Sequence, residues 1–185
     1  MTRIPRRAVL TGAAATAGLA ACGNGVGSSG AADIDARVAS SLEFLEKNYP
    51  GTQDLNQNSF GKLVMPLITE ASFGFGAAYG RGALLVNDVT VDYYSATQAS
   101  FGIQAGAQQY SHVLYFMTQP ALAGFRASPG WAAGAGIQYA LNDQGGDIST
   151  QTTNVLAPVV AVVFGQAGLL AGANVDGTKY TRIIP

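Results

Sequence analysis

Few residues of this 185-residue sequence could perform chemistry. His112 is the only histidine and Cys22 the only cysteine, which excludes the usual zinc sites because these combine at least three protein ligands, drawn mainly from such side chains. A general base needs a nucleophile and an orienting acid, and no Gly-x-Ser-x-Gly segment offers a hydrolase serine. His112 begins an apolar run, where an imidazole typically packs against its neighbours. The sequence therefore predicts no enzyme, no metal and no cofactor.

Two glycine-rich segments partly match ligand-binding loops. Residues 142–147 hold oxygen donors and turn glycines, but they lack the alternating donors and the closing glutamate of a calcium loop. We interpret them as a solvated hairpin loop. Residues 74–79 begin like a dinucleotide-binding fingerprint, yet Tyr79 stands where the third glycine belongs. Neither segment predicts a ligand.

Binding of lipid is a second possibility, for which basic side chains can contact the phosphate and aromatic side chains the membrane interface. The candidate lipid-binding residues are Lys62, Arg81, Arg126, Lys179, Arg182 and Trp131. The alternative is that the charges are scattered for solubility and that Trp131 belongs to the core. In a regular strand, Lys179 and Arg182 would lie on opposite faces.

The overall charge argues against nucleic acid as a partner. The chain carries a formal net charge of -1, and without Arg3, Arg6 and Arg7 it has seven basic and eleven acidic residues. Binding to nucleic acid requires a basic face that neutralises phosphates. The hydrophobic share of 48% is that of a chain able to build a core.

The first 21 residues predict an export signal. A basic start with Arg6 and Arg7 resembles a twin-arginine signal, and the apolar run of residues 8–21 is too short to span a bilayer. Leu19-Ala20-Ala21-Cys22 resembles a bacterial lipobox, in which cleavage precedes the cysteine and that cysteine is acylated. Residues 22–32 are then the lipidated Cys22 followed by a flexible, glycine- and serine-rich linker. We expect a lipid-anchored protein on the periplasmic side of a bacterial envelope, at the outer membrane where one is present.

One amphipathic helix is predicted over residues 33–49. Its apolar residues recur every three or four positions and form one stripe, and Pro50 ends it. This stripe consists of Ile34, Val38, Leu42, Leu45 and Tyr49. Because the helix is net acidic, we expect it to dock on the domain core and not on anionic lipid.

Residues 71–117 predict an antiparallel β meander of several short strands. Over residues 73–82, four glycines and one alanine alternate with larger side chains, a period of two that is typical of a strand. A face of glycines suits a barrel bend or a close approach of another backbone. A turn is expected at Asn87 and Asp88, and residues 113–117 predict a strand buried on both sides.

Shorter elements surround this meander. Residues 52–58 are interpreted as a polar connection, and residues 61–66 as a short strand in which Pro66 occupies an edge or a bulge. Thr118 is expected to cap a helix that ends at Arg126 and buries Leu122 and Phe125. Further strands are predicted over residues 134–141, 158–164, 169–175 and 178–184. The predicted class is α+β: a small antiparallel β-barrel core with about three helices on its surface.

Several motifs, in consistent order over residues 60–184, resemble the SYLF domain family. Among them are Tyr79-Gly80-Arg81-Gly82, Phe101-Gly102-Ile103-Gln104-Ala105-Gly106, Gly130-Trp131 and Gly177-Thr178-Lys179-Tyr180. The resemblance implies a SYLF-like domain over residues 33–185 with its barrel core at about 60–184. It also implies phospholipid binding, directed at phosphoinositides in eukaryotic members, some of which contact the actin machinery. Similar bacterial members are exported and often lipidated.

The leading hypothesis is an envelope lipoprotein whose domain binds phospholipid without catalysis. One alternative is a structural or protein-interaction module of the cell envelope. Another is a small hydrolase or carrier with an internal apolar pocket, and a transmembrane barrel is a further one.

Overall fold

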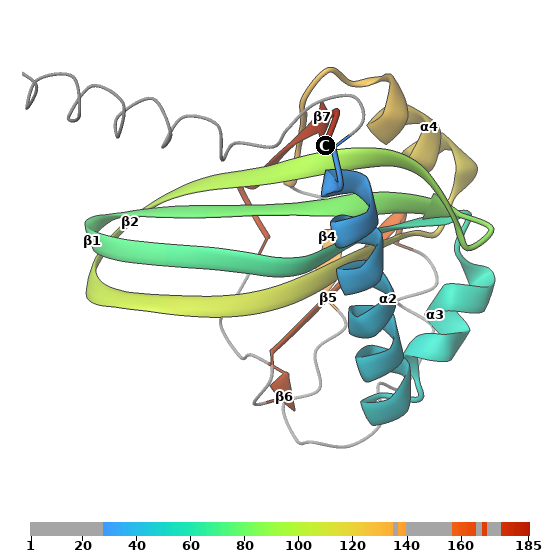
Figure 1. The fold of residues 1–185 in the computed structure, drawn as a ribbon, viewed down its shortest axis with the longest axis horizontal. Helices are drawn as coiled ribbons and strands as arrows, with labels where there is room; N and C mark the ends of the chain where they lie inside the picture. Colours follow the sequence, from blue (N-terminus) through green and yellow to red (C-terminus); the bar gives the residue numbers. More distant parts are fainter. Residues whose placement is uncertain (1–27, 135–136, 140–156, 166–167, 170–174) are drawn as a thin grey trace, which may run out of the picture.

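A computed structural model of the chain describes residues 28–134, 137–139, 157–165, 168–169 and 175–185. Within these ranges the chain forms three α-helices and one seven-stranded sheet, which curls into a half-barrel (Figure 1). The predicted α+β class, with helices on a barrel-like sheet, is confirmed. The predicted signal peptide, Cys22 and the loop at 142–147 lie outside the described residues.

Two long strands, β1 (Gly61–Val86) and β2 (Val89–Phe116), form the centre of the sheet. They meet at a two-residue turn in which Asn87 and Asp88 have φ values of 50° and 62°, as a type I′ hairpin turn requires. The predicted turn is confirmed, but the prediction of several short strands is wrong. Irregularities bend the two strands without ending them. These lie between Met65 and Ile68, between Phe73 and Gly74, and between Leu84 and Leu85.

The β1–β2 ribbon doubles back at the end farthest from the helices, so that the two halves of β1 lie side by side (Figure 1). Glycines permit this approach. A Cβ built on Gly82 would overlap the carbonyl oxygen of Val64, and one on Gly80 would overlap that of Leu67. The prediction that the glycine-lined face admits a second backbone is confirmed at these two positions. Pro66 lies in the first irregularity of β1, as expected.

The remaining strands extend the sheet from β2. Both β7 (Lys179–Ile183) and β5 (Val159–Gly165) pair with β2 in antiparallel fashion, at its beginning and its end respectively. β3 (Trp131–Ala132) adds to β7 and β6 (Gly168–Leu169) to β5, while β4 (Ile137–Tyr139) runs parallel to β5. The strands predicted at the positions of β5 and β7 are confirmed to within one residue. Those predicted around β4 and β6 are described only in part.

Two helices cover one face of the sheet. α2 (Gly30–Asn48) begins three residues before its predicted start, and it buries Ile34, Val38 and Leu45 of the predicted stripe. Docking of this helix on the core is thereby confirmed. The interpretation of residues 52–58 as a polar connection is wrong, because they form α3 (Thr52–Asn58). Because α3 has only seven residues, of which only Thr52 and Leu55 are buried, its sequence shows no recognisable helical periodicity.

α4 (Gln119–Ala127) covers the opposite face. The Thr118 hydroxyl accepts a hydrogen bond from the Ala121 amide at 3.3 Å, and Leu122 and Phe125 are buried. The predicted cap and inner face are therefore confirmed. Residues 113–117 are buried as predicted, because Leu114 and Phe116 face α4 while Val113 and Tyr115 face α2. None of the helices in the described ranges is long and apolar enough to cross a membrane.

Candidate functional site

Three of the six predicted lipid-binding residues meet at one corner of the domain. Arg126 comes from the last turn of α4, Trp131 from β3, and Arg182 from β7. Asp92, which the sequence analysis did not select, lies between the two arginines. We name this group, Asp92, Arg126, Trp131 and Arg182, the arginine corner.

The two guanidinium groups of the arginine corner share one carboxylate. Arg126 Nη2 lies 3.4 Å from Asp92 Oδ2, and Arg182 Nε lies 3.4 Å from Asp92 Oδ1. Arg182 Nη2 also donates to the Arg126 carbonyl oxygen at 3.2 Å. The arginine side chains are about half exposed (46% and 50%), whereas that of Asp92 is 16% exposed. The corner therefore carries an excess of one positive charge, on donors that solvent reaches.

Aromatic rings form the inner wall of this corner. The Trp131 ring lies 5.4 Å from that of Phe125 and 5.9 Å from that of Tyr180, and it is partly exposed. The Arg182 guanidinium lies 6.0 Å from the centroid of the Tyr94 ring, within the range of a cation–π contact. Ile184, two residues beyond Arg182, is 73% exposed. Positive charge and an indole thus lie at this corner, and an exposed aliphatic side chain follows Arg182 two residues along the chain.

Lys179 lies near the arginine corner but on the opposite face of β7, as the alternation of the strand predicts. Its side chain runs along Gly130, where a built Cβ would come within 2.7 Å of Lys179 Cε. Arg81 lies on β1, at a cleft beside α2. The structure therefore does not bring Lys179 and Arg81 together with the other two arginines.

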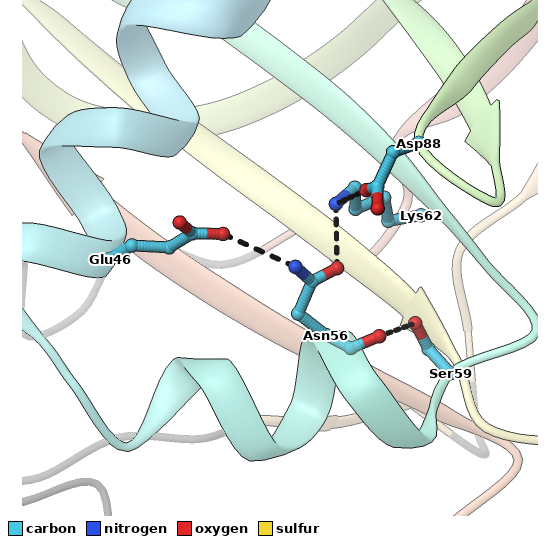
Figure 2. Close-up of polar contacts among 5 residues, drawn as sticks. All are labelled: Glu46, Asn56, Ser59, Lys62 and Asp88. Atoms are coloured by element: carbon cyan, nitrogen blue, oxygen red, sulfur yellow. Dashed lines mark hydrogen bonds and ion pairs between the residues drawn. The ribbon is translucent and has the colours of Figure 1, made fainter.

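Lys62 is buried in a polar cluster between α3, α2 and the β1–β2 turn (Figure 2). Its ammonium group donates to Asp88 Oδ1 and to Asn56 Oδ1, both at 2.6 Å, and Asn56 Nδ2 donates to Glu46 Oε1 at 3.2 Å. The cluster ties α3 to α2 and to the β1–β2 turn. The ammonium group of Lys62 is therefore engaged inside the protein, and the predicted lipid contact does not fit its position.

Replacing Lys62 with methionine is expected to destabilise the protein by about 1–3 kcal/mol, because Asn56 and Asp88 lose a charged hydrogen-bond donor. Urea unfolding measures this change. Lys47→Met, at an exposed position of α2, is the matched control and should change the free energy of unfolding by less than about 0.5 kcal/mol. Equal effects of the two substitutions would show that the cluster contributes no stability.

His112 lies inside the protein and not at a strand end. Its Nε2 is 2.8 Å from the Tyr180 hydroxyl, and the side chain is buried within β2. Burial lowers the pKa of His112 to about 3, because the charged imidazolium would lose its solvation. The ring is thus neutral at physiological pH and serves packing.

No metal site is evident in the part of the chain that the structure describes, where no three acidic, histidine or cysteine side chains gather. Asp92 of the arginine corner and the exposed Ile184 were not among the residues selected from the sequence. Asp92 could have been noticed as a carboxylate inside the predicted meander of residues 71–117, where a charged side chain needs a partner. Ile184 carries no such signal, because single exposed aliphatic residues are common.

Comparison with known protein families adds one finding. Residues 97–182, a little under half of the chain, match the family model described as "Ysc84: Las17-binding protein actin regulator". This range includes Arg126, Trp131 and Arg182 of the arginine corner, whereas Asp92 precedes it. No curated protein matches the chain. The match confirms the resemblance to the SYLF family over these residues.

Proposed function

We propose, from the premise that residues 97–182 are a Ysc84/SYLF family domain, that this protein binds phospholipid without catalysis and does so at the arginine corner. SYLF domains are lipid-binding modules, which supports the ligand class. The observation that carries the proposed location is the meeting of Arg126 and Arg182 on a single carboxylate, with Trp131 packed against the neighbouring Phe125. Actin binding is not part of the proposal.

The geometry of the corner suits a phosphate group. Its ion pairs of 3.4 Å are longer than the 2.7–2.9 Å of a charge-assisted hydrogen bond, so the guanidinium groups keep donors for a second anion. Each guanidinium can contact two phosphate oxygens at once, which lysine cannot do. Trp131 and Ile184 would then face the interfacial and acyl regions of the bilayer, where an indole ring is favourable.

The route of the chain supports the envelope role that we propose. The Ser28 hydroxyl donates to the Pro185 carbonyl oxygen at 3.0 Å, so the described chain enters beside its own C-terminus and close to Arg182. A lipidated Cys22 would be six residues away, at most about 20 Å along an extended chain. The proposed acyl anchor and the arginine corner would therefore reach the same membrane. Anchoring would raise the effective concentration of lipid at the corner.

Flotation with vesicles tests the proposal, using the full chain with Cys22→Ser so that acylation makes no contribution. We expect binding to vesicles that contain phosphatidylglycerol and weaker binding to phosphatidylcholine alone, with a loss at high salt because exposed charges are screened. Trp131, the only tryptophan, should show a blue-shifted emission on binding. Absence of binding to both kinds of vesicle would refute the proposal.

A triple variant, Arg126→Gln, Arg182→Gln and Asp92→Asn, tests the location. The asparagine avoids leaving a carboxylate without its arginine partners, which would by itself destabilise the corner. We expect at least tenfold weaker binding to anionic vesicles, because two charged hydrogen-bond donors are lost. Lys47→Gln on the exposed side of α2 is the control and should bind normally. Unchanged binding by the triple variant would place the lipid contact elsewhere.

A further inference from the structure

Four side chains from four separate parts of the chain meet around Lys62 (Figure 2). Glu46 comes from α2, Asn56 from α3, Lys62 from β1, and Asp88 from the β1–β2 turn. The Lys62 side chain is 4% exposed, and its Nζ lies 2.6 Å from both Asn56 Oδ1 and Asp88 Oδ1. A primary amine is thus held against an amide and a carboxylate inside the protein. We name these four residues the lysine cluster.

The arrangement of the lysine cluster suits attack of the amine on the amide. The nitrogen of a neutral lysine is a nucleophile, and the Asn56 side chain offers an amide carbon as its target. Asp88 faces Lys62 Nζ, where a carboxylate can accept a proton as a general base. Glu46 Oε1 accepts a hydrogen bond from Asn56 Nδ2 at 3.2 Å, so a carboxylate also faces the nitrogen that would leave. Each group therefore lies where the reaction needs it.

We propose that Lys62 and Asn56 form an intramolecular isopeptide bond. Asp88 takes one proton from the Lys62 ammonium group, and the neutral Nζ attacks Asn56 Cγ after the amide has turned its face to it. The Nζ–Cγ bond forms and the Cγ–Nδ2 bond breaks. One proton from Nζ and the proton held by Asp88 pass to Nδ2, which leaves as ammonium beside Glu46. The Asp88 carboxylate is thereby restored, and the reaction needs no oxidant, reductant or cofactor.

The surroundings of Lys62 favour this reaction over attack by another amine. Of the three lysines in the chain, Lys47 and Lys179 are exposed. Groups held in a reactive geometry reach effective molarities of about 10⁵–10⁸ M, which allows a slow reaction at an amide to proceed. Asn56, Lys62 and Asp88 also line a cleft of about 220 Å³, and the Asp88 side chain is 76% exposed. Ammonium can leave through this cleft into solvent.

The bond would fix α3 to the sheet. Asn56 and Lys62 are six positions apart, so the bond joins the middle of α3 to the beginning of β1. α3 has seven residues and buries only Thr52 and Leu55, so few apolar contacts hold it in place. A covalent link would compensate for this. The proposal concerns the maturation of the chain and does not depend on phospholipid binding at the arginine corner.

The intact mass of the folded full chain carrying Cys22→Ser, measured after storage for several days, tests the proposal. We expect a mass below that calculated from the sequence by one molecule of ammonia. Trypsin should then fail to cleave the denatured chain after Lys62. Chymotrypsin, which cleaves after Phe60 between the two residues, should release two peptides that remain joined.

Three results would overturn the proposal. The first is a folded chain with the full calculated mass. The second is a loss of ammonia with tryptic cleavage after Lys62 intact, because the ammonia would then come from another residue. The third is the loss of one molecule of water with cleavage blocked, which would join Lys62 to the Asp88 carboxyl group and not to Asn56.

Substitutions test the role of each group. Lys62→Arg keeps the positive charge but removes the primary amine, so it should retain the full calculated mass. Asp88→Asn suits the turn because asparagine tolerates a positive φ, and it should slow the loss of ammonia about a hundredfold by removing the general base. Lys47→Arg is the control and should lose ammonia at the native rate. Loss of ammonia from Lys62→Arg, or a native rate in Asp88→Asn, would contradict the assigned roles.

Discussion

Gly82→Ala should lower the free energy of unfolding by about 3 kcal/mol or more, although it adds a single methyl group. The added Cβ would overlap the Val64 carbonyl oxygen and would lie 2.7 Å from Met65 Sδ. The sulfur atom can move, but the carbonyl belongs to the adjacent half of β1, so relief requires the two halves to separate. Insertion into a well-packed core typically costs 1–3 kcal/mol and more where backbone must shift. That is a large part of the stability of an ordinary domain.

Urea unfolding followed by Trp131 emission measures this effect. Gly124→Ala is the control, for which we expect a change of stability in the opposite direction. Gly124 lies in α4, where a built Cβ meets nothing within 4 Å. In that exposed helical position alanine should stabilise the protein by up to about 1 kcal/mol. The same substitution at two glycines is thus expected to have opposite signs. A Gly82→Ala variant as stable as the native protein would show that the two halves of β1 do not approach closely.

The glycine pattern shows how far the sequence predicts this fold. Alternation over residues 73–82 revealed both strand conformation and the need for space at Gly80 and Gly82, because side-chain size is a local property. It could not reveal that residues 61–86 form one strand. Bends caused by register shifts depend on the partner strand, and the partner is distant in the sequence. α3 was missed for a similar reason, since Lys62 and Glu46, which bind its Asn56 side chain, lie outside the helix.

The candidate site likewise depends on contacts between residues that are distant in the sequence. The sequence could select Arg126 and Arg182 as basic residues, but these lie 56 positions apart and meet only in the folded chain, through Asp92 and through the hydrogen bond from Arg182 to the Arg126 carbonyl oxygen. It selected Lys62 with equal weight, because a buried lysine and an exposed lysine look alike without their neighbours. Composition alone gives the set of cations, and tertiary structure decides which of them face solvent together.

Acid is expected to destabilise the protein through His112. Burial lowers the pKa of this imidazole from its usual 6.5 to about 3. Between these two values, the unfolded chain binds a proton that the folded chain does not bind. The stabilisation is complete above about pH 6.5 and is lost as the pH falls toward 3. Its slope is about 1.4 kcal/mol per pH unit, which amounts to a total on the order of 5 kcal/mol. The acidic side chains also make the stability depend on pH. A comparison of variants at His112 therefore isolates the contribution of this residue.

His112→Gln supplies the comparison, since glutamine keeps a polar group for the Tyr180 hydroxyl but does not titrate. Unfolding in urea at pH 7 and pH 4 should show that the native protein loses about 3 kcal/mol more than the variant over this interval. Tyr180→Phe removes the 2.8 Å hydrogen bond and should lower stability at both pH values, while it keeps the pH dependence. This follows because desolvation, and not the tyrosine, lowers the pKa of His112. Equal pH dependence of the native protein and His112→Gln would mean that the imidazole is solvated, and that the interior around β2 and β7 is more open than the structure shows.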